Sequence, residues 1–234
     1  MTKLGGYVYW LGDDLRAYRA GSYAEEAIST PDIDRIIADA YAPQSVEMHA
    51  LEHGGHHFIV FNFANLTLLY DTDLGRWMER RSLGLDRWRA SCFAVLDKST
   101  ILVGDYANGN IYTLEQDTFS EAGTEIERIV HFPPLSSDPR PLFVHELYLD
   151  IETGVGITSG QGSDPTVMLS WSEDDGRTWS NDFEASMGAL GNHRWRATFS
   201  RLGRSRNRTF RARISDPVKV AILGAWARFD VGLQ

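Results

Sequence analysis

Three histidines stand close together in the stretch HGGHH, at His53, His56 and His57. Imidazole nitrogens are common ligands of zinc, so this spacing raises the question of a metal site. The Gly54-Gly55 pair between them is typical of a tight turn, which places the histidines on the strands that flank the turn of a β-hairpin. No cysteine or carboxylate stands beside them at a recognised ligand spacing. We therefore expect a plain hairpin here, and we predict no bound metal and no cofactor.

A second candidate for chemistry is the stretch SWSEDDGRTWS, residues 170–180. Its spacing S-x-D-x-G-x-T-W is the Asp box known from sialidases and other propeller proteins. The box consists of Ser172, Asp174, Gly176, Thr178 and Trp179. In such a turn the carboxylate can bond the backbone, the glycine can adopt a positive φ, and the tryptophan can cover the turn. This arrangement stabilises a hairpin and places no reacting atom, so we predict a structural role for the box.

No other pattern in the chain predicts a catalytic centre. HELYL at 145–149 lacks the second histidine of a zinc-protease helix, and the glycine-rich stretch at 154–162 lacks the spacing of a phosphate loop. The G-x-S-x-G elbow of serine hydrolases does not occur. The single cysteine, Cys92, stands in an apolar run and is expected to be a small buried side chain. The sequence therefore predicts that the protein is not an enzyme.

Positive charge is concentrated in the last fifth of an acidic chain. The net charge is −9, but residues 1–184 carry 13 Lys and Arg against 30 Asp and Glu, whereas residues 185–234 carry 10 against 2. A basic segment on an acidic protein can meet the acidic part of a neighbouring copy, or it can meet phosphate. The start MTKLGGYVYW has no signal-peptide pattern, and no apolar run is long enough to span a membrane. We expect synthesis in the cytoplasm and no membrane insertion.

The basic segment contains the sequence NHRWRATFSRLGRSRNRTFRARIS, residues 192–215. Apolar and polar residues alternate in both halves, which predicts two strands, each with one apolar face and one face that carries arginine. We expect these strands to pair as a hairpin through LGRSRN. Arginines in one row repel one another unless anions or carboxylates face them, and these can come from a partner or from the same chain. The interface candidates are Arg194, Arg196, Arg201, Arg204, Arg206, Arg208, Arg211 and Arg213.

The rest of the chain is dominated by short runs of aromatic and β-branched residues with turn residues about every ten positions, which predicts many short antiparallel strands. One short connector helix is expected near 31–40, where Pro31 suits the first helical position. We therefore predict an all-β fold of β-propeller-like architecture. Blades and the connector helix are assigned to 1–130, a hinge with four prolines to 131–141, and a β-rich region with the Asp box and the arginine-rich hairpin to 142–234.

The order of these motifs resembles the packaged-DNA stabilisation, or tail-hub (nozzle), proteins of short-tailed bacteriophages. The resemblance is carried by VMLSWSEDDGRTWS, RLGRSR and SDPVKVAILGAW, preceded in the family's order by GYVYWLGDD, AISTPDIDRII, YDTDLGRWMERRS, DRWRASCFAV and ILVGDYANGNIYTLE. It spans nearly the whole chain. Members of the family are longer, with additional blades at the N-terminus, so this chain is similar to their C-terminal part or to a short member.

The resemblance implies a structural protein of the virion tail. Such a protein forms a ring, commonly a hexamer, below the portal and adaptor, closes the channel, and retains packaged DNA without sequence-specific binding until ejection. It also docks tail fibre or needle proteins. Glutamate in place of Arg204, Arg206 and Arg208 is expected to prevent assembly while the monomer still folds. Two alternatives stay open: an Asp-box propeller that binds or cleaves glycans, and a nucleic-acid-binding module that uses the arginine hairpin.

Overall fold

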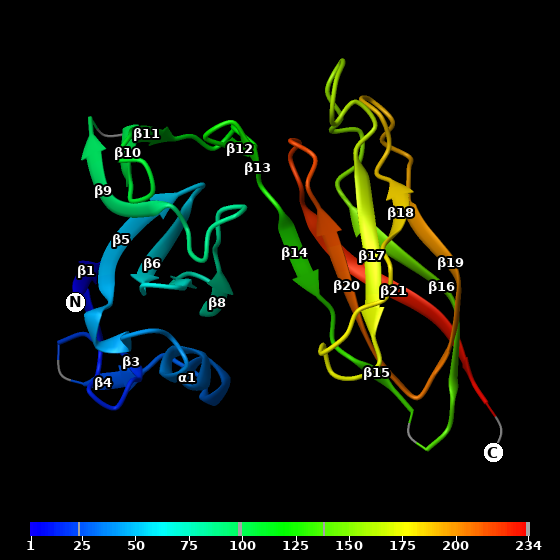
Figure 1. Ribbon diagram of the computed structural model, residues 1–234, viewed down its shortest axis with the longest axis horizontal. Helices are drawn as coiled ribbons and strands as arrows, with labels where there is room; N and C mark the ends of the chain where they lie inside the picture. Colours follow the sequence, from blue (N-terminus) through cyan, green and yellow to red (C-terminus); the bar gives the residue numbers. More distant parts are fainter. Residues whose placement is uncertain (23, 98–99, 138, 233–234) are drawn as a thin grey trace. The chain divides into compact units, whose positions relative to one another are not determined.

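The computed structural model describes residues 1–22, 24–97, 100–137 and 139–232. It divides the chain into two compact units, unit 1 (Met1–Gln116) and unit 2 (Asp117–Gln234). Regular structure is almost entirely antiparallel β, with one short α-helix (Figure 1). The expected all-β fold class with a single connector helix is confirmed.

Unit 1 contains, among the residues that the structure describes, three meander sheets in which each strand pairs with its neighbours in sequence. The strands are β1 (Thr2–Leu4), β2 (Tyr7–Leu11), β3 (Ala17–Ala20) and β4 (Glu25–Ala27) in the first sheet, β5 (Glu47–His53), β6 (His56–Asn62), β7 (Thr67–Asp71) and β8 (Arg76–Glu79) in the second, and β9 (Ala90–Leu96), β10 (Thr100–Asp105) and β11 (Ile111–Leu114) in the third. Four-stranded meanders are the blades of β-propellers, so unit 1 has the expected propeller-like architecture.

The second sheet is the middle layer of unit 1, because apolar side chains on both of its faces are buried. All five residues of β7 are buried. On one face Phe61 shares a core with Tyr9 of the first sheet and with Ile37 of the helix. On the other face Val60 shares a core with Trp88, which precedes the third sheet. Each outer sheet therefore packs against the middle one.

The helix α1 (Pro31–Ala38) begins and ends close to where the sequence predicts. Thr30 caps it, because its hydroxyl oxygen accepts a hydrogen bond from the Ile33 N–H at 3.5 Å. Pro31 occupies the first turn, and Ile37 is fully buried. A short 3₁₀ turn, η1 (Pro43–Ser45), then leads into β5. No described helix is long and apolar enough to cross a membrane.

Cys92 is exposed, and the expectation of a buried cysteine is wrong. It lies on β9, one of the two edge strands of the third sheet. The next residue, Phe93, packs against Trp88, with ring centroids 5.4 Å apart. Neighbouring side chains of a strand point to opposite faces, so Cys92 faces away from the core. The apolar run around it predicted a strand correctly but not the face on which Cys92 lies.

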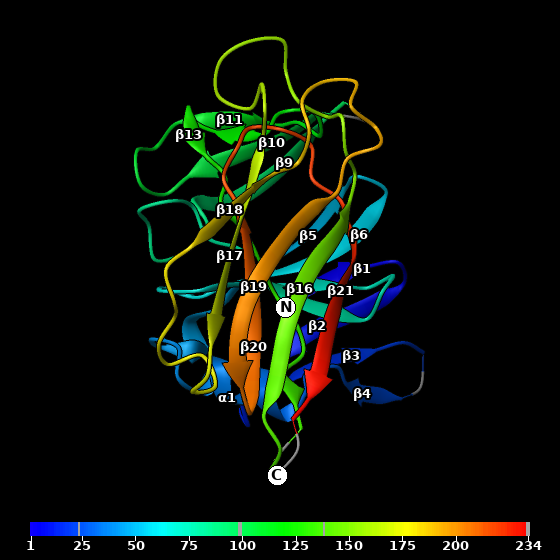
Figure 2. The same cartoon turned by 90° about the vertical axis from the view of Figure 1, so that its right-hand side faces the viewer.

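Unit 2 is a sandwich of two antiparallel sheets whose inner faces share one core (Figure 2). The first sheet consists of β14 (Arg128–His131), β20 (Asn207–Ile214), β17 (Thr166–Ser172) and β18 (Phe183–Ser186), in this order, with β15 (Leu135–Ser136) also paired to β20; the second consists of β19 (Ala197–Ser205), β16 (Leu142–Ile151) and β21 (Ile222–Val231). A small hairpin of β12 (Ser120–Glu121) and β13 (Thr124–Glu125) precedes them. Leu147 and Phe199 of one sheet meet Leu169 and Phe210 of the other in the core.

The proline-rich stretch at 131–141 lies inside unit 2, not between the units. β14 ends at its first residue, and β15 lies within it, and both strands pair with β20. Prolines interrupt the ladder of hydrogen bonds and thus leave two short edge strands here instead of one long one. The division of the chain therefore falls between Gln116 and Asp117, earlier than the expected hinge.

The two arginine-bearing strands do not pair with each other. β19 pairs with β16, whereas β20 pairs with β14, β15 and β17. The chain passes from one sheet to the other at Arg206, so the expected hairpin is an arch between the two layers of the sandwich. Both apolar faces point into the core, as the alternation predicted, and the opposite faces point to opposite sides of unit 2. The expected single row of eight arginines is therefore wrong.

Candidate interface surface

Arg208 is a core residue of unit 2. Its side chain is 3% exposed and forms an ion pair with Glu173. The guanidinium also donates hydrogen bonds to the carbonyl oxygens of Leu202 and Arg204, and it lies over the Trp171 ring at 5.0 Å from the centroid. The expectation that Arg208 belongs to an exposed interface is therefore corrected.

Two further arginines of β20, on the outer face of its sheet, have partners within the chain. Arg211 donates a hydrogen bond from Nε to Ser170 Oγ at 3.1 Å, and its guanidinium lies 4.1 Å from the centroid of the Trp179 ring. Arg213 forms ion pairs with Glu127, at 3.1 Å, and with Asp182. Intramolecular contacts thus account for this part of the basic segment.

The remaining five arginine candidates are exposed on the β19 side of unit 2 and on the arch: Arg194, Arg196, Arg201, Arg204 and Arg206. Arg196 lies over the ring of Tyr148, 4.4 Å from its centroid. Within the described ranges, the other four form neither an ion pair nor a side-chain hydrogen bond. This group, here called the arch arginines, presents positive charge that no carboxylate of the described chain neutralises.

An apolar groove of about 470 Å³ lies at one open side of the sandwich. Val130 and Leu135 line it from β14 and β15, and Leu223 and Trp226 line it from β21. β14 and β21 are edge strands of the two sheets, so backbone N–H and C=O groups on their outer sides lack a neighbouring strand. Leu223 is 75% exposed and Trp226 is 59% exposed. Large apolar side chains gathered at two sheet edges are typical of a protein contact surface.

The Asp box forms the structural turn that the sequence predicted, although it lies in the sandwich and not in a propeller blade. Asp174 Oδ1 accepts hydrogen bonds from Ser172 Oγ at 2.7 Å and from the Thr178 N–H at 2.8 Å, and Oδ2 accepts one from Thr178 Oγ1 at 2.6 Å. Gly176 has φ +89°, and the Trp179 indole N–H donates to its carbonyl oxygen at 3.1 Å. All five residues thus serve the turn itself.

These hydrogen bonds, above all those from Thr178, lower the pKa of Asp174 to about 2. A carboxylate whose pKa is lower in the folded than in the unfolded chain stabilises the fold above about pH 4, and this stabilisation is lost as the pH falls toward 2. We expect Asp174→Asn to lower the free energy of unfolding at neutral pH, by an amount that shrinks as the pH falls from about 4 to about 2. Urea unfolding of both proteins across this pH range measures the difference, and a difference independent of pH would contradict this role.

The histidine stretch forms the expected β5–β6 hairpin. His53 pairs with His56 across Gly54 and Gly55, which have φ of +62° and +80°. The sequence did not indicate that Asp71 and Asp73 lie beside this hairpin. Asp71 is the last residue of β7 and Asp73 lies in the turn before β8, more than ten positions after His57 in the sequence. Their proximity depends on the antiparallel register of β6 with β7.

Comparisons with known proteins match both units. A family model described as "Bacteriophage P22 Gp10, beta-propeller" matches residues 6–119, and one described as "Bacteriophage P22 Gp10, beta-sandwich" matches residues 127–230. No curated protein matches the chain significantly. A solved structure titled "Glycoside hydrolase" aligns with 94% of this chain and 69% of its own, at 11% sequence identity and a TM-score of 0.24. Such a low score supports no argument about fold or activity. The boundaries of the two family matches agree with the division between unit 1 and unit 2.

Proposed function

This chain belongs to the bacteriophage P22 Gp10 family of phage structural proteins, and from that premise we propose that it is a ring-forming hub of a short phage tail. The observation that carries the proposal is the pair of family matches, which together cover nearly the whole chain. In this role the protein assembles with copies of itself below the portal and adaptor and closes the DNA channel. It retains packaged DNA until ejection and provides a docking surface for fibre or needle proteins.

The surface of unit 2 supports this role. A ring of identical subunits needs two different surfaces that meet head to tail, so that rotation closes the assembly. The arch arginines offer positive charge, and the acidic majority of the chain, residues 1–184, offers carboxylates on the next copy. The apolar groove and the edge strands β14 and β21 supply a second kind of contact surface.

The alternative functions have less support. A glycan-binding propeller would use exposed tryptophans of unit 1, but Trp88 is buried, with Arg80 over its ring at 3.9 Å from the centroid, and Trp10 and Trp77 are half-buried. A module that binds DNA through the arginine hairpin would use the arginines of both strands, whereas Arg208, Arg211 and Arg213 of β20 have partners within unit 2, and the chain as a whole carries a net charge of −9. A structural hub needs neither a sugar site nor a DNA-binding hairpin.

Reversing the charge of two arch arginines tests the proposal. We expect Arg204→Glu combined with Arg206→Glu to leave the protein folded, because both side chains are exposed. We also expect it to abolish incorporation into particles, since opposed like charges at an interface cost several kcal/mol. The measurement is immunogold electron microscopy of phage particles made in cells where the variant is the only copy. The wild-type protein should be labelled at the tail vertex, and the variant should give particles without label.

The matched control is Arg76→Glu combined with Arg81→Glu, which makes the same charge change at two exposed positions of unit 1. We expect this control to assemble normally. Normal incorporation of the Arg204 and Arg206 variant would rule out the arch as a subunit contact. Absence of wild-type label from both intact and disrupted particles would rule out the tail hub itself.

A further inference from the structure

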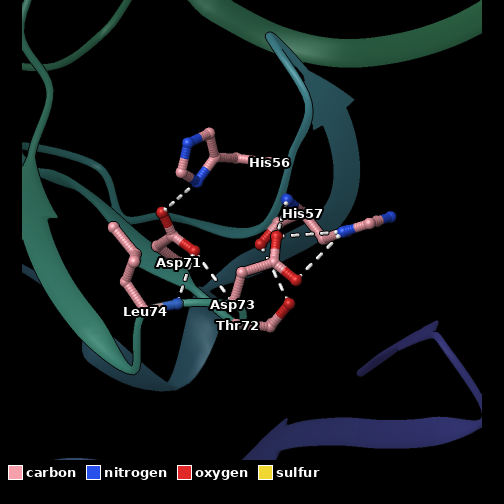
Figure 3. A network of polar contacts seen from close by, with 6 residues as sticks. All are labelled: His56, His57, Asp71, Thr72, Asp73 and Leu74. Atoms are coloured by element: carbon pink, nitrogen blue, oxygen red, sulfur yellow. Dashed lines mark hydrogen bonds and ion pairs between the residues drawn. The ribbon is translucent and has the colours of Figure 1, made fainter.

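One histidine and two carboxylates lie together in the middle sheet of unit 1 (Figure 3). His56 is the first residue of β6, Asp71 is the last residue of β7, and Asp73 lies in the turn that leads to β8. Antiparallel pairing places the beginning of β6 beside the end of β7. One potential ligand atom from each of the three side chains lies within 4.8 Å of the other two.

The contact between His56 and Asp71 has the distance of a hydrogen bond but not its direction. Nδ1 of His56 lies 2.8 Å from Oδ2 of Asp71. Nevertheless, this buried nitrogen makes no hydrogen bond with any residue that the structure describes. Two such atoms can share a proton on the line between them, or they can share a cation beside that line. Adjacent ligands of a tetrahedral ion with bonds of about 2.0–2.2 Å are about 3.3–3.6 Å apart, so the pair can share a cation after a small outward movement of the half-exposed His56 ring.

Two backbone hydrogen bonds hold the carboxylate of Asp71 in a fixed orientation. Its side chain is only 2% exposed. Oδ1 accepts hydrogen bonds from the backbone N–H groups of Asp73, at 2.9 Å, and Leu74, at 3.1 Å. Oδ2 is the atom that faces His56, as Figure 3 shows. A carboxylate buried to this degree requires a compensating positive charge, which a divalent ion supplies fully.

Asp73 approaches the same place from the solvent side. Its side chain is half-exposed, and its carboxylate accepts a hydrogen bond from the His57 N–H at 2.9 Å. The His57 ring contacts this carboxylate at 3.0 Å. His57 is therefore a neighbour that orients Asp73, while Asp73 can offer an oxygen to an ion that lies between His56 and Asp71.

We propose that His56, Asp71 and Asp73 form a binding site for one divalent first-row transition ion, such as Zn²⁺, that ties the start of β6 to the turn between β7 and β8. An imidazole nitrogen with two carboxylate oxygens suits such an ion, and water completes its coordination. The site is structural: it holds one end of the middle sheet, on which both cores of unit 1 depend. It revises the sequence-based expectation of no metal at the histidine hairpin, and it does not depend on the hub role.

Zinc titration of the full chain tests the site. For the wild-type protein we expect one Zn²⁺ bound per chain by isothermal titration calorimetry, and a rise in the unfolding temperature when Zn²⁺ is added. We expect His56→Gln to weaken binding by at least about tenfold, since loss of even an outer-shell partner weakens metal sites by 10–100-fold. His56→Gln should also abolish the zinc-dependent rise in the unfolding temperature. Asp73→Asn, at a half-exposed position, is a second variant with the same expected loss.

The matched control is His145→Gln in unit 2. His145 Nε2 lies 2.8 Å from Asp230 Oδ2, and its exposure is similar to that of His56, but this pair belongs to no three-ligand cluster within the described residues. We expect this control to bind Zn²⁺ like the wild-type protein. Absence of zinc binding by the wild-type protein would show that His56 and Asp71 form an ion pair only. Equal losses in His56→Gln and His145→Gln would show nonspecific binding, and either result would overturn the proposal.

Discussion

Arg208→Ala is expected to destabilise unit 2 by about 3 kcal/mol, one of the two largest effects that we predict for a single substitution. The guanidinium donates to the carbonyl oxygens of Leu202 and Arg204, and the first of these hydrogen bonds is buried. Alanine leaves these acceptors without their charged donor. It also leaves a cavity beside the rings of Trp171 and Phe210, over which the guanidinium lies. Glu173 contributes less, because its side chain is half-exposed and can be hydrated after the change.

Urea unfolding followed by tryptophan fluorescence measures this loss. Arg206→Ala is the matched control, since Arg206 is two residues away, exposed, and without an ion pair in the described part of the chain. We expect that substitution to change the free energy of unfolding by less than about 0.5 kcal/mol. Similar stabilities of the two variants would contradict the stabilising role of Arg208 in the core of unit 2.

Phe61→Ala is expected to destabilise unit 1 by about 3–5 kcal/mol. Phe61 is fully buried on β6 in the middle sheet, where its ring lies 5.1 Å from that of Trp77. Alanine removes most of the side chain from a core that Tyr9 of the first sheet and Ile37 of the helix share. Surrounding strands are fixed by their hydrogen bonds, so the space is filled only in part.

Hydrogen exchange read by mass spectrometry localises this effect. Amides of β5–β8 should lose protection in Phe61→Ala, whereas amides of β16, β17 and β20, which belong to the separate core of unit 2, should keep theirs. Val95→Ala is the control, because Val95 is a 71% exposed strand residue of the same unit. If protection fell equally in both units, unit 1 would not have a core of its own.

The sequence predicted well what depends on local pattern. Alternation in β20 placed Phe210, Ala212 and Ile214 on the inner face, and all three are buried. Capping and proline signals located α1, and the Asp-box spacing located its turn. In each case the residues that decide the structure lie within a few positions of one another, so short-range physics suffices.

Which strands pair with each other could not be predicted in the same way. Two strands whose apolar faces meet across a sandwich have the same alternation as two strands that pair in one sheet, so β19 and β20 were expected to form a hairpin. The buried position of Arg208 could have been predicted from the alternation. Arg208 and Phe210 are two residues apart on β20, so their side chains point to the same face of the strand. The cluster of His56 with Asp71 and Asp73 has no comparable signal in the sequence, because it depends on the register between two strands.

The arch between β19 and β20 also determines when unit 2 can acquire its structure. Neither arm of the arch has a partner next to it in sequence: Arg128 pairs with Ile214, and Leu142 pairs with both Ser205 and Val231. Pairings between such distant segments slow folding, whereas the meanders of unit 1 need only their immediate neighbours. During translation unit 1 can therefore fold while β14 and β16 still wait for strands that have not left the ribosome. We therefore expect the sandwich to fold more slowly than unit 1 and to leave its unpaired strands exposed for longer.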